Sequence, residues 1–118
     1  MGPDAMDFSA AITLQADQAH LAVTGEVDVV TTVQVRWRLD DALAQGCTRF
    51  TVDVAGLTFI DATGLDAFVR LHNATAQLGG TVTFVATSPA FRRVCGLTGL
   101  TEAFRLSGLS EPVTYDMA

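Results

Sequence analysis

The chain has 118 residues and a net charge of −6, from seven Lys+Arg and thirteen Asp+Glu, and 49% of it is hydrophobic. This length fits one compact domain with its own core, and the hydrophobic content excludes a disordered chain. The acidic balance argues against direct binding to nucleic acid, which attracts proteins with clustered Lys and Arg.

In the first third of the chain, apolar residues first alternate as in a β-hairpin and then follow the spacing of a helix. Strands are predicted over Phe8–Leu14 and Ala19–Gly25, with a turn near Asp17. A helix is predicted over Val29–Gln45, with Asp28 as an acidic cap before it and Gly46 to stop it.

This first helix is predicted to be amphipathic, and the spacing assigns each residue a side. The apolar stripe, predicted to face the core, comprises Val30, Val33, Trp37, Leu43 and Ala44. The opposite, solvent side is predicted to carry Arg36, Asp40 and Asp41.

The remaining two thirds alternate strands with helices. An interior strand at Arg49–Val54 leads through residues 55–60 into a helix at Thr63–Leu78, in which Leu65, Phe68 and His72 share one spacing and Leu71, Thr75 and Leu78 another. The later elements are a strand at Thr81–Ala86, a helix at Pro89–Leu97 capped by Ser88 and ended by Gly96 and Gly99, and a short strand at Ala103–Leu106.

This order predicts an α/β fold with a mixed sheet of four or five strands and helices against at least one face. We expect one domain over residues 8–107, an irregular leader at residues 1–7 and a tail at residues 108–118. No apolar run approaches the roughly 20 residues that cross a bilayer, and the start lacks a signal-peptide pattern. The sequence therefore predicts a cytoplasmic protein without membrane association.

Two cysteines and two histidines show no metal-ligand spacing. Cys47 and Cys95 lack a CxxC arrangement, so reduced structural thiols are expected, with redox sensing as the alternative. His20 and His72 lie far apart in the sequence, and no glycine loop ends in Gly-Lys-Ser/Thr. Neither a metal site nor a nucleotide-hydrolysing site is predicted, and no cofactor is expected.

The run Leu57–Leu65 is the most informative stretch, because a strand there delivers an acid, a hydroxyl and a glycine to a helix entrance. A helix N-terminus presents unpaired N–H groups and tolerates a phosphate, so Thr63 is chemically suited to modification. Phosphorylation would add roughly −1.5 to −2 charges beside Asp61. The alternative is structural, with Asp61 an ordinary cap and Gly64 serving tight packing.

Two motifs in order, Gly25-Glu26-Val27-Asp28 and Phe59-Ile60-Asp61-Ala62-Thr63-Gly64-Leu65, resemble those of the STAS domains of anti-sigma factor antagonists. The resemblance runs from Phe8 to Leu106. It implies that Thr63 accepts a phosphoryl group from an anti-sigma kinase, which is an anti-sigma factor that is itself a serine/threonine kinase and supplies ATP. It also implies that the unphosphorylated protein binds an anti-sigma factor, that a phosphatase resets it, and that it regulates transcription in a stress response without catalysis of its own.

The resemblance also implies a partner-binding surface around the acceptor, made of Glu26, Asp28, Asp61, Ala62, Gly64, Leu65 and Asp66. Two positions depart from the family pattern. Ala62 stands where a second hydroxyl is common, which leaves Thr63 as the single acceptor. Asp66 stands where a neutral residue is frequent, which bears on partner affinity.

Two other functions fit parts of the same sequence. The run Asp61-Ala62-Thr63-Gly64 contains the acid and glycine of an aspartic protease, but an α/β chain is the wrong setting for that carboxylate pair. The stronger alternative is a STAS module that works without phosphorylation, as a scaffold or ligand sensor in a signalling assembly.

Overall fold

The computed structural model describes residues 8–106 of the chain. The elements are β2 Ser9–Gln15, β3 Gln18–Val27, α1 Thr32–Ala44, β4 Arg49–Ile60, α2 Ala62–Gln77, β5 Thr81–Val85 and α3 Pro89–Thr98. The predicted leader and tail lie outside the described residues, as does the last residue of the predicted domain. None of the described helices has the length and apolar character to cross a membrane.

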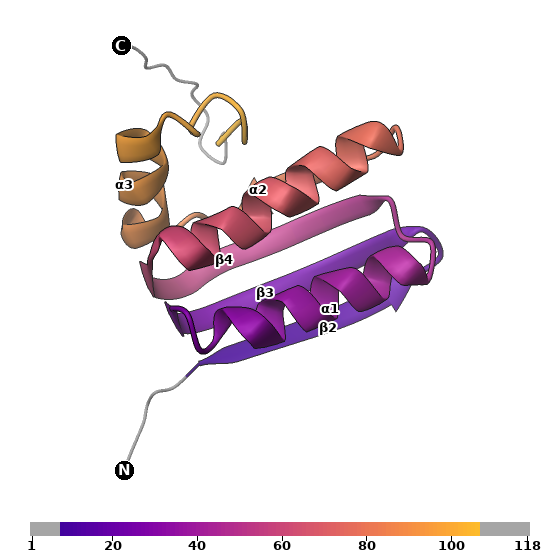
Figure 1. Cartoon of the computed structure of the whole chain (residues 1–118), viewed down its shortest axis with the longest axis horizontal. Coiled ribbons are helices and arrows are strands. Elements are labelled where there is room, and N and C mark those ends of the chain that lie inside the picture. The colour runs from indigo at the N-terminus through magenta and orange to yellow at the C-terminus, as the bar shows by residue number, and fades with distance from the viewer. Residues whose placement is uncertain (1–7, 107–118) are drawn as a thin grey trace.

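The four strands form one mixed sheet in the order β2-β3-β4-β5, which confirms the predicted α/β class. The hairpin β2–β3 is antiparallel, whereas β4 runs parallel to both β3 and β5. Parallel neighbours need crossovers, and right-handed crossovers made in the same direction place their helices on one face. Accordingly α1 and α2 lie side by side over one face of the sheet, and α3 lies across its end (Figure 1).

The core lies between this sheet face and the helices. Alternate strand residues such as Leu21, Val23 and Val52 are fully buried, as the two-residue period of a strand requires. An aromatic cluster closes the end of the core beside α3, where the Phe68 and Phe84 rings meet edge to face with centroids 5.5 Å apart. This packing holds α2 and α3 in fixed positions on the sheet.

Helix α1 buries a different row of residues from the one predicted, while Arg36, Asp40 and Asp41 are exposed as predicted. Its inner row is Thr32, Val35, Leu39 and Ala42. The predicted core residues Val33 and Trp37 point outward, 46% and 69% exposed. The pattern misled because α1 carries apolar residues on both sides, and compact Val35 and Ala42 let the helix approach the sheet more closely than Trp37 would.

The predicted fifth strand at Ala103–Leu106 is wrong, because residues 101–105 form turns. Within them Phe104 N–H donates to the Leu100 carbonyl at 2.9 Å, and the Phe104 ring lies 4.6 Å from that of Phe84. Alternate apolar residues here therefore fill the core from a turn. The predicted stop at Gly96 is also wrong, since α3 continues to Thr98 and ends at Gly99, whose φ is 76°.

Candidate functional site

Two loops meet where the parallel strands β3 and β4 end. Val27 pairs with Ile60 in the sheet, and the Asp61 N–H donates to the Val27 carbonyl at 3.1 Å. The chain after β3 and the start of α2 are thereby held side by side. In open α/β sheets, binding sites form at the carboxyl ends of the strands. We call residues 26–31 and 59–66 the acceptor corner.

Asp61 begins α2 as its N-cap. Its Oδ1 accepts from the Gly64 N–H at 3.0 Å, and its backbone carbonyl accepts from the Leu65 N–H at 2.9 Å. The side-chain bond satisfies one of the N–H groups that the start of a helix leaves unpaired, and the carbonyl accepts the first hydrogen bond of the helix itself. The cap fixes the direction in which the first turn of α2 leaves the sheet, and so fixes the position of Thr63.

Thr63 is the second residue of α2 and is exposed. Its hydroxyl has no hydrogen-bond partner among residues 8–106, so it is open to solvent. The side chain sits at the positive end of the helix dipole, where a negatively charged group is stabilised. Thr63 thus offers an exposed hydroxyl at a helix N-terminus, an environment that favours negative charge.

Gly64 allows α2 to approach β3 closely. A Cβ at this position would lie 2.6 Å from Val27 Cγ1 and 3.0 Å from the Val27 carbonyl oxygen. The next residue, Leu65, is only 6% exposed and belongs to the core. These two predicted partner-binding residues therefore face inward and position the corner.

The outward residues near the start of the same helix are Ala62, Thr63 and Asp66. Asp66 forms an exposed ion pair with Arg70, in which Oδ2 and Nε are 3.9 Å apart. Exposed pairs of this kind contribute little to stability, so Asp66 remains free to meet a partner.

Asp28 organises the facing loop. Its Oδ1 accepts from the backbone N–H groups of Val30 and Thr31, both at 2.9 Å. The hydrogen bond from the Thr31 N–H, which outweighs an opposing cost of desolvation, lowers the pKa of Asp28 below its ordinary value of 3.8. Asp28 is therefore a carboxylate at neutral pH, and α1 begins at Thr32 because residues 28–31 are held as a turn.

Thr31 also holds this loop in place, and the sequence analysis missed it. Its hydroxyl accepts from the Asp28 N–H at 2.9 Å and donates to the Glu26 carbonyl at 2.7 Å. It thereby joins the end of β3 to the start of α1, while the Glu26 side chain stays exposed. The spacing Asp-x-x-Thr, typical of side chains that bond to nearby backbone, was the available signal.

Apolar side chains complete the corner. Val29, Val30 and Phe59 are exposed, and Phe59 pairs across the sheet with Glu26. Within residues 8–106 no three His, Cys, Asp or Glu side chains cluster as metal ligands would. The corner thus combines a free hydroxyl, carboxylates, a helix N-terminus and apolar surface, which suits docking to another protein.

Comparisons with known proteins agree with this geometry. Residues 10–110 match the protein-family model described as "Mlab, STAS domain". The anti-sigma-F factor antagonist RsfB of Mycobacterium tuberculosis is 30% identical over 91 residues, which cover 75% of this chain and 71% of RsfB.

Solved structures share the fold. An anti-sigma factor antagonist from Mycobacterium paratuberculosis superposes with a TM-score of 0.70 at 24% identity, over 83% of each chain. The antagonist SpoIIAA in its unphosphorylated form gives a TM-score of 0.72 at 20% identity, over 80% of this chain and 84% of SpoIIAA. The phosphorylated form of the Bacillus protein gives 0.66 at 22% identity, over 81% and 86%. The chain belongs to the STAS-domain family of anti-sigma factor antagonists.

Proposed function

We propose that this chain binds an anti-sigma factor while Thr63 is unphosphorylated and releases it when Thr63 is phosphorylated. The observation that carries the proposal is the position of Thr63: an exposed, unbonded hydroxyl in the first turn of α2, beside the loop organised by Asp28. The relative RsfB is named an anti-sigma-F factor antagonist, and SpoIIAA has been solved in a phosphorylated form.

The proposed transfer uses a partner kinase, since the sequence holds no glycine loop that ends in Gly-Lys-Ser/Thr. The kinase supplies ATP. Thr63 Oγ1 attacks the γ-phosphorus, a new O–P bond forms, the bond from that phosphorus to ADP breaks, and the hydroxyl proton leaves to a base of the kinase. In this scheme the chain is a substrate and a binder with no catalysis of its own, and it acts in the cytoplasm.

The switch follows from charge. Phosphorylation adds roughly −1.5 to −2 charges at neutral pH, at a corner that already holds the Asp28 carboxylate and Asp61. A partner surface shaped for the neutral hydroxyl would meet repulsion between like charges and a cost of desolvating the phosphate. Release of the antagonist would leave the anti-sigma factor free to hold its sigma factor, and a phosphatase would restore the binding form.

Phosphoryl transfer is tested with the purified chain, ATP and purified anti-sigma kinases of the source organism. Intact mass spectrometry should show the gain of one phosphate, which Thr63→Ala abolishes and Thr63→Ser, the matched control, retains. A chain that binds the kinase but stays unmodified would instead be a scaffold or ligand sensor. Transfer to any residue other than Thr63 would contradict the assignment.

A further inference from the structure

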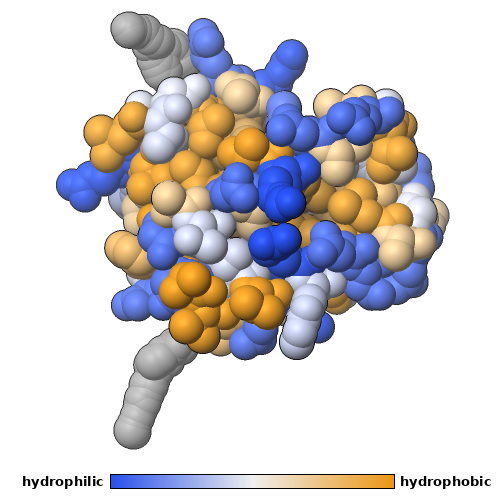
Figure 2. All heavy atoms as spheres, in the orientation of Figure 1, coloured by the Kyte–Doolittle hydropathy of each residue, from blue (hydrophilic) through white to orange (hydrophobic). Residues whose placement is uncertain are grey.

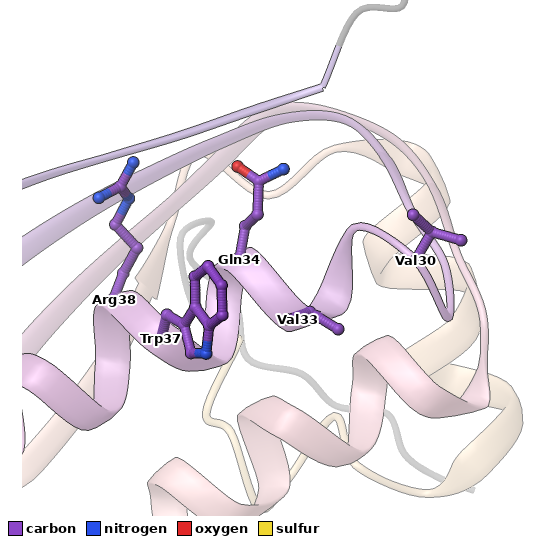
Figure 3. A pocket seen from close by; sticks show the side chains of 5 residues that line it. All are labelled: Val30, Val33, Gln34, Trp37 and Arg38. Atoms are coloured by element: carbon purple, nitrogen blue, oxygen red, sulfur yellow. The ribbon is translucent and has the colours of Figure 1, made fainter.

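The outward side of α1 carries a line of apolar side chains that nothing in residues 8–106 covers. The line, which we call the α1 stripe, consists of Val30, Val33 and Trp37. Val30 is 72% exposed, just before the helix. Apolar surface gathers over the beginning of α1 (Figure 2). Val33 and Trp37 project from the helix there, beside a shallow depression lined also by Gln34 and Arg38 (Figure 3).

The stripe is not needed for the fold. Helix α1 already packs on the sheet through its inner row, and Arg38 fastens it to β2 by donating from Nε to the Ala10 carbonyl at 2.8 Å. A contiguous exposed apolar patch on a monomer commonly marks an interaction site, and tryptophan is enriched among the residues that dominate binding energy. The stripe therefore has the character of a docking surface.

The stripe starts at the acceptor corner. Val30 belongs to both, and its N–H is held by Asp28 Oδ1 at 2.9 Å. Trp37 is five residues beyond Thr32, where α1 begins next to the corner, so at about 1.5 Å of rise per residue it lies roughly 8 Å along the helix. A protein docked over Thr63 needs only to extend along α1 to cover Trp37.

The small size of the α1 stripe and the net charge of the chain indicate what kind of molecule covers it. A stable interface takes about 20–30 residues from each side, so three side chains cannot hold a partner alone. A second copy meeting at this stripe would bring together two chains that each carry a net charge of −6 over a small area. The stripe therefore fits better as an extension of the surface around Thr63.

We propose that the α1 stripe receives an amphipathic helix of the same anti-sigma factor that docks at the acceptor corner, with Trp37 as its anchor. This inference rests on the proposed function. A helix fits because Val33 and Trp37, four residues apart on α1, form a ridge that packs against the apolar row of another helix, and Val30 extends this surface from the turn before α1.

The charges at the two ends of the stripe specify the partner helix further. Exposed Glu26 and the Asp28 carboxylate precede the stripe, and exposed Asp40 and Asp41 follow Trp37 by three and four residues. Residues at these spacings share one side of a helix. The partner helix should therefore carry Lys or Arg at both ends of its apolar row.

Trp37 is the only tryptophan of the chain, so it reports on the stripe directly. The full chain, labelled with 5-fluorotryptophan, should give one ¹⁹F resonance that shifts or broadens when the unlabelled anti-sigma kinase is added. In the free chain the resonance should be independent of concentration, and acrylamide should quench Trp37 readily. A concentration-dependent shift would indicate a second copy, and a protected free Trp37 would indicate cover by the chain itself; either result overturns the inference.

Affinity provides the second measurement, by calorimetry with the same kinase. Trp37→Ala should raise Kd about tenfold or more, whereas Leu78→Ala, an exposed leucine just past the far end of α2, should leave Kd unchanged. Trp37→Ala should still be phosphorylated at saturating kinase. An unchanged Kd with normal transfer to Thr63 would contradict docking at the α1 stripe but leave the proposed function intact. A raised Kd with no phosphoryl transfer to Thr63 would support docking at the stripe and contradict the proposed function.

Discussion

At the scale of single residues, the acceptor corner depends on a glycine beside the acceptor. Gly64→Ala forces its new methyl group against Val27, at distances of 2.6 Å to Cγ1 and 3.0 Å to the carbonyl oxygen. Overpacking of this kind costs about 1–3 kcal/mol. We expect Gly64→Ala to lower the free energy of unfolding by that amount in urea denaturation.

The control for this substitution is another helical glycine with room around it. A Cβ at Gly96 in α3 meets nothing within 4 Å. Gly96→Ala should therefore gain about 0.5–1 kcal/mol, because alanine has the higher helix propensity. Equal effects of the two substitutions would show that helix propensity, and not the contact with Val27, sets the cost at Gly64.

The cysteines are both buried and free, as the sequence suggested. Burial raises the pKa of the Cys95 thiol from 9.0 to about 12. Cys95 is therefore a neutral thiol at physiological pH and a poor nucleophile. In the folded chain it should react with a disulfide reagent only as fast as the protein unfolds, and fast labelling without denaturant would favour the redox alternative.

The same shift predicts how stability depends on pH in alkali. The folded chain holds the Cys95 proton more tightly than the unfolded chain, so this contribution to stability is complete below about pH 9 and is lost as the pH rises towards 12. The Cys95→Ala chain should lack that part of the decline. An identical pH dependence of urea midpoints for both chains would contradict this assignment.

At the scale of elements, α2 depends on its cap. Asp61→Ala leaves the Gly64 N–H without the acceptor that it has at 3.0 Å, and loss of such a cap costs about 0.5–2 kcal/mol. Asp61→Asn keeps the cap and removes the charge, so it should retain most of the stability. Thermal unfolding of the two variants separates the roles, and an equal loss in both would mean that the charge, not the cap, stabilises the helix.

The order of the elements was predictable because each leaves a local signal. Ser88 and Pro89 begin α3 as expected, with the Ser88 hydroxyl accepting from the Phe91 N–H at 3.2 Å. The position of Thr63 at the start of α2 was likewise predictable from the acid, hydroxyl and glycine that follow a strand. The parallel pairing of β3 with β4 brings Asp28 next to this site. The resemblance to a family implied that Asp28 lies in the surface around Thr63, and the local pattern did not.

The error in α1 has a physical origin. Periodicity shows that a helix has an apolar side, but it does not choose between two such sides when both exist. In α1, Val35 and Leu39 pack against the sheet, whereas Val33 and Trp37 are exposed to solvent. A different ambiguity affected Phe104, because alternate apolar residues predicted a strand where a turn places this ring in the core.

At the scale of the whole molecule, the residues that stabilise the fold are separate from the residues proposed to bind a partner. The buried face of the sheet and the inner sides of the helices provide the core, while the acceptor corner and the α1 stripe lie together at the surface where β3 and β4 end. A phosphate on Thr63 would thus change the surface charge without disturbing the packing. We therefore expect the phosphorylated and unphosphorylated chains to have similar stability.

The central claim is that charge at Thr63 decides whether the chain binds its anti-sigma factor. Its most direct test is calorimetric titration of that anti-sigma factor with the chain before and after stoichiometric phosphorylation, with Thr63→Ala as the uncharged control. The account predicts that only the phosphorylated chain has a Kd at least tenfold higher, which corresponds to a loss of about 1.4 kcal/mol of binding free energy. Equal affinities of the phosphorylated chain, the unphosphorylated chain and Thr63→Ala would contradict it.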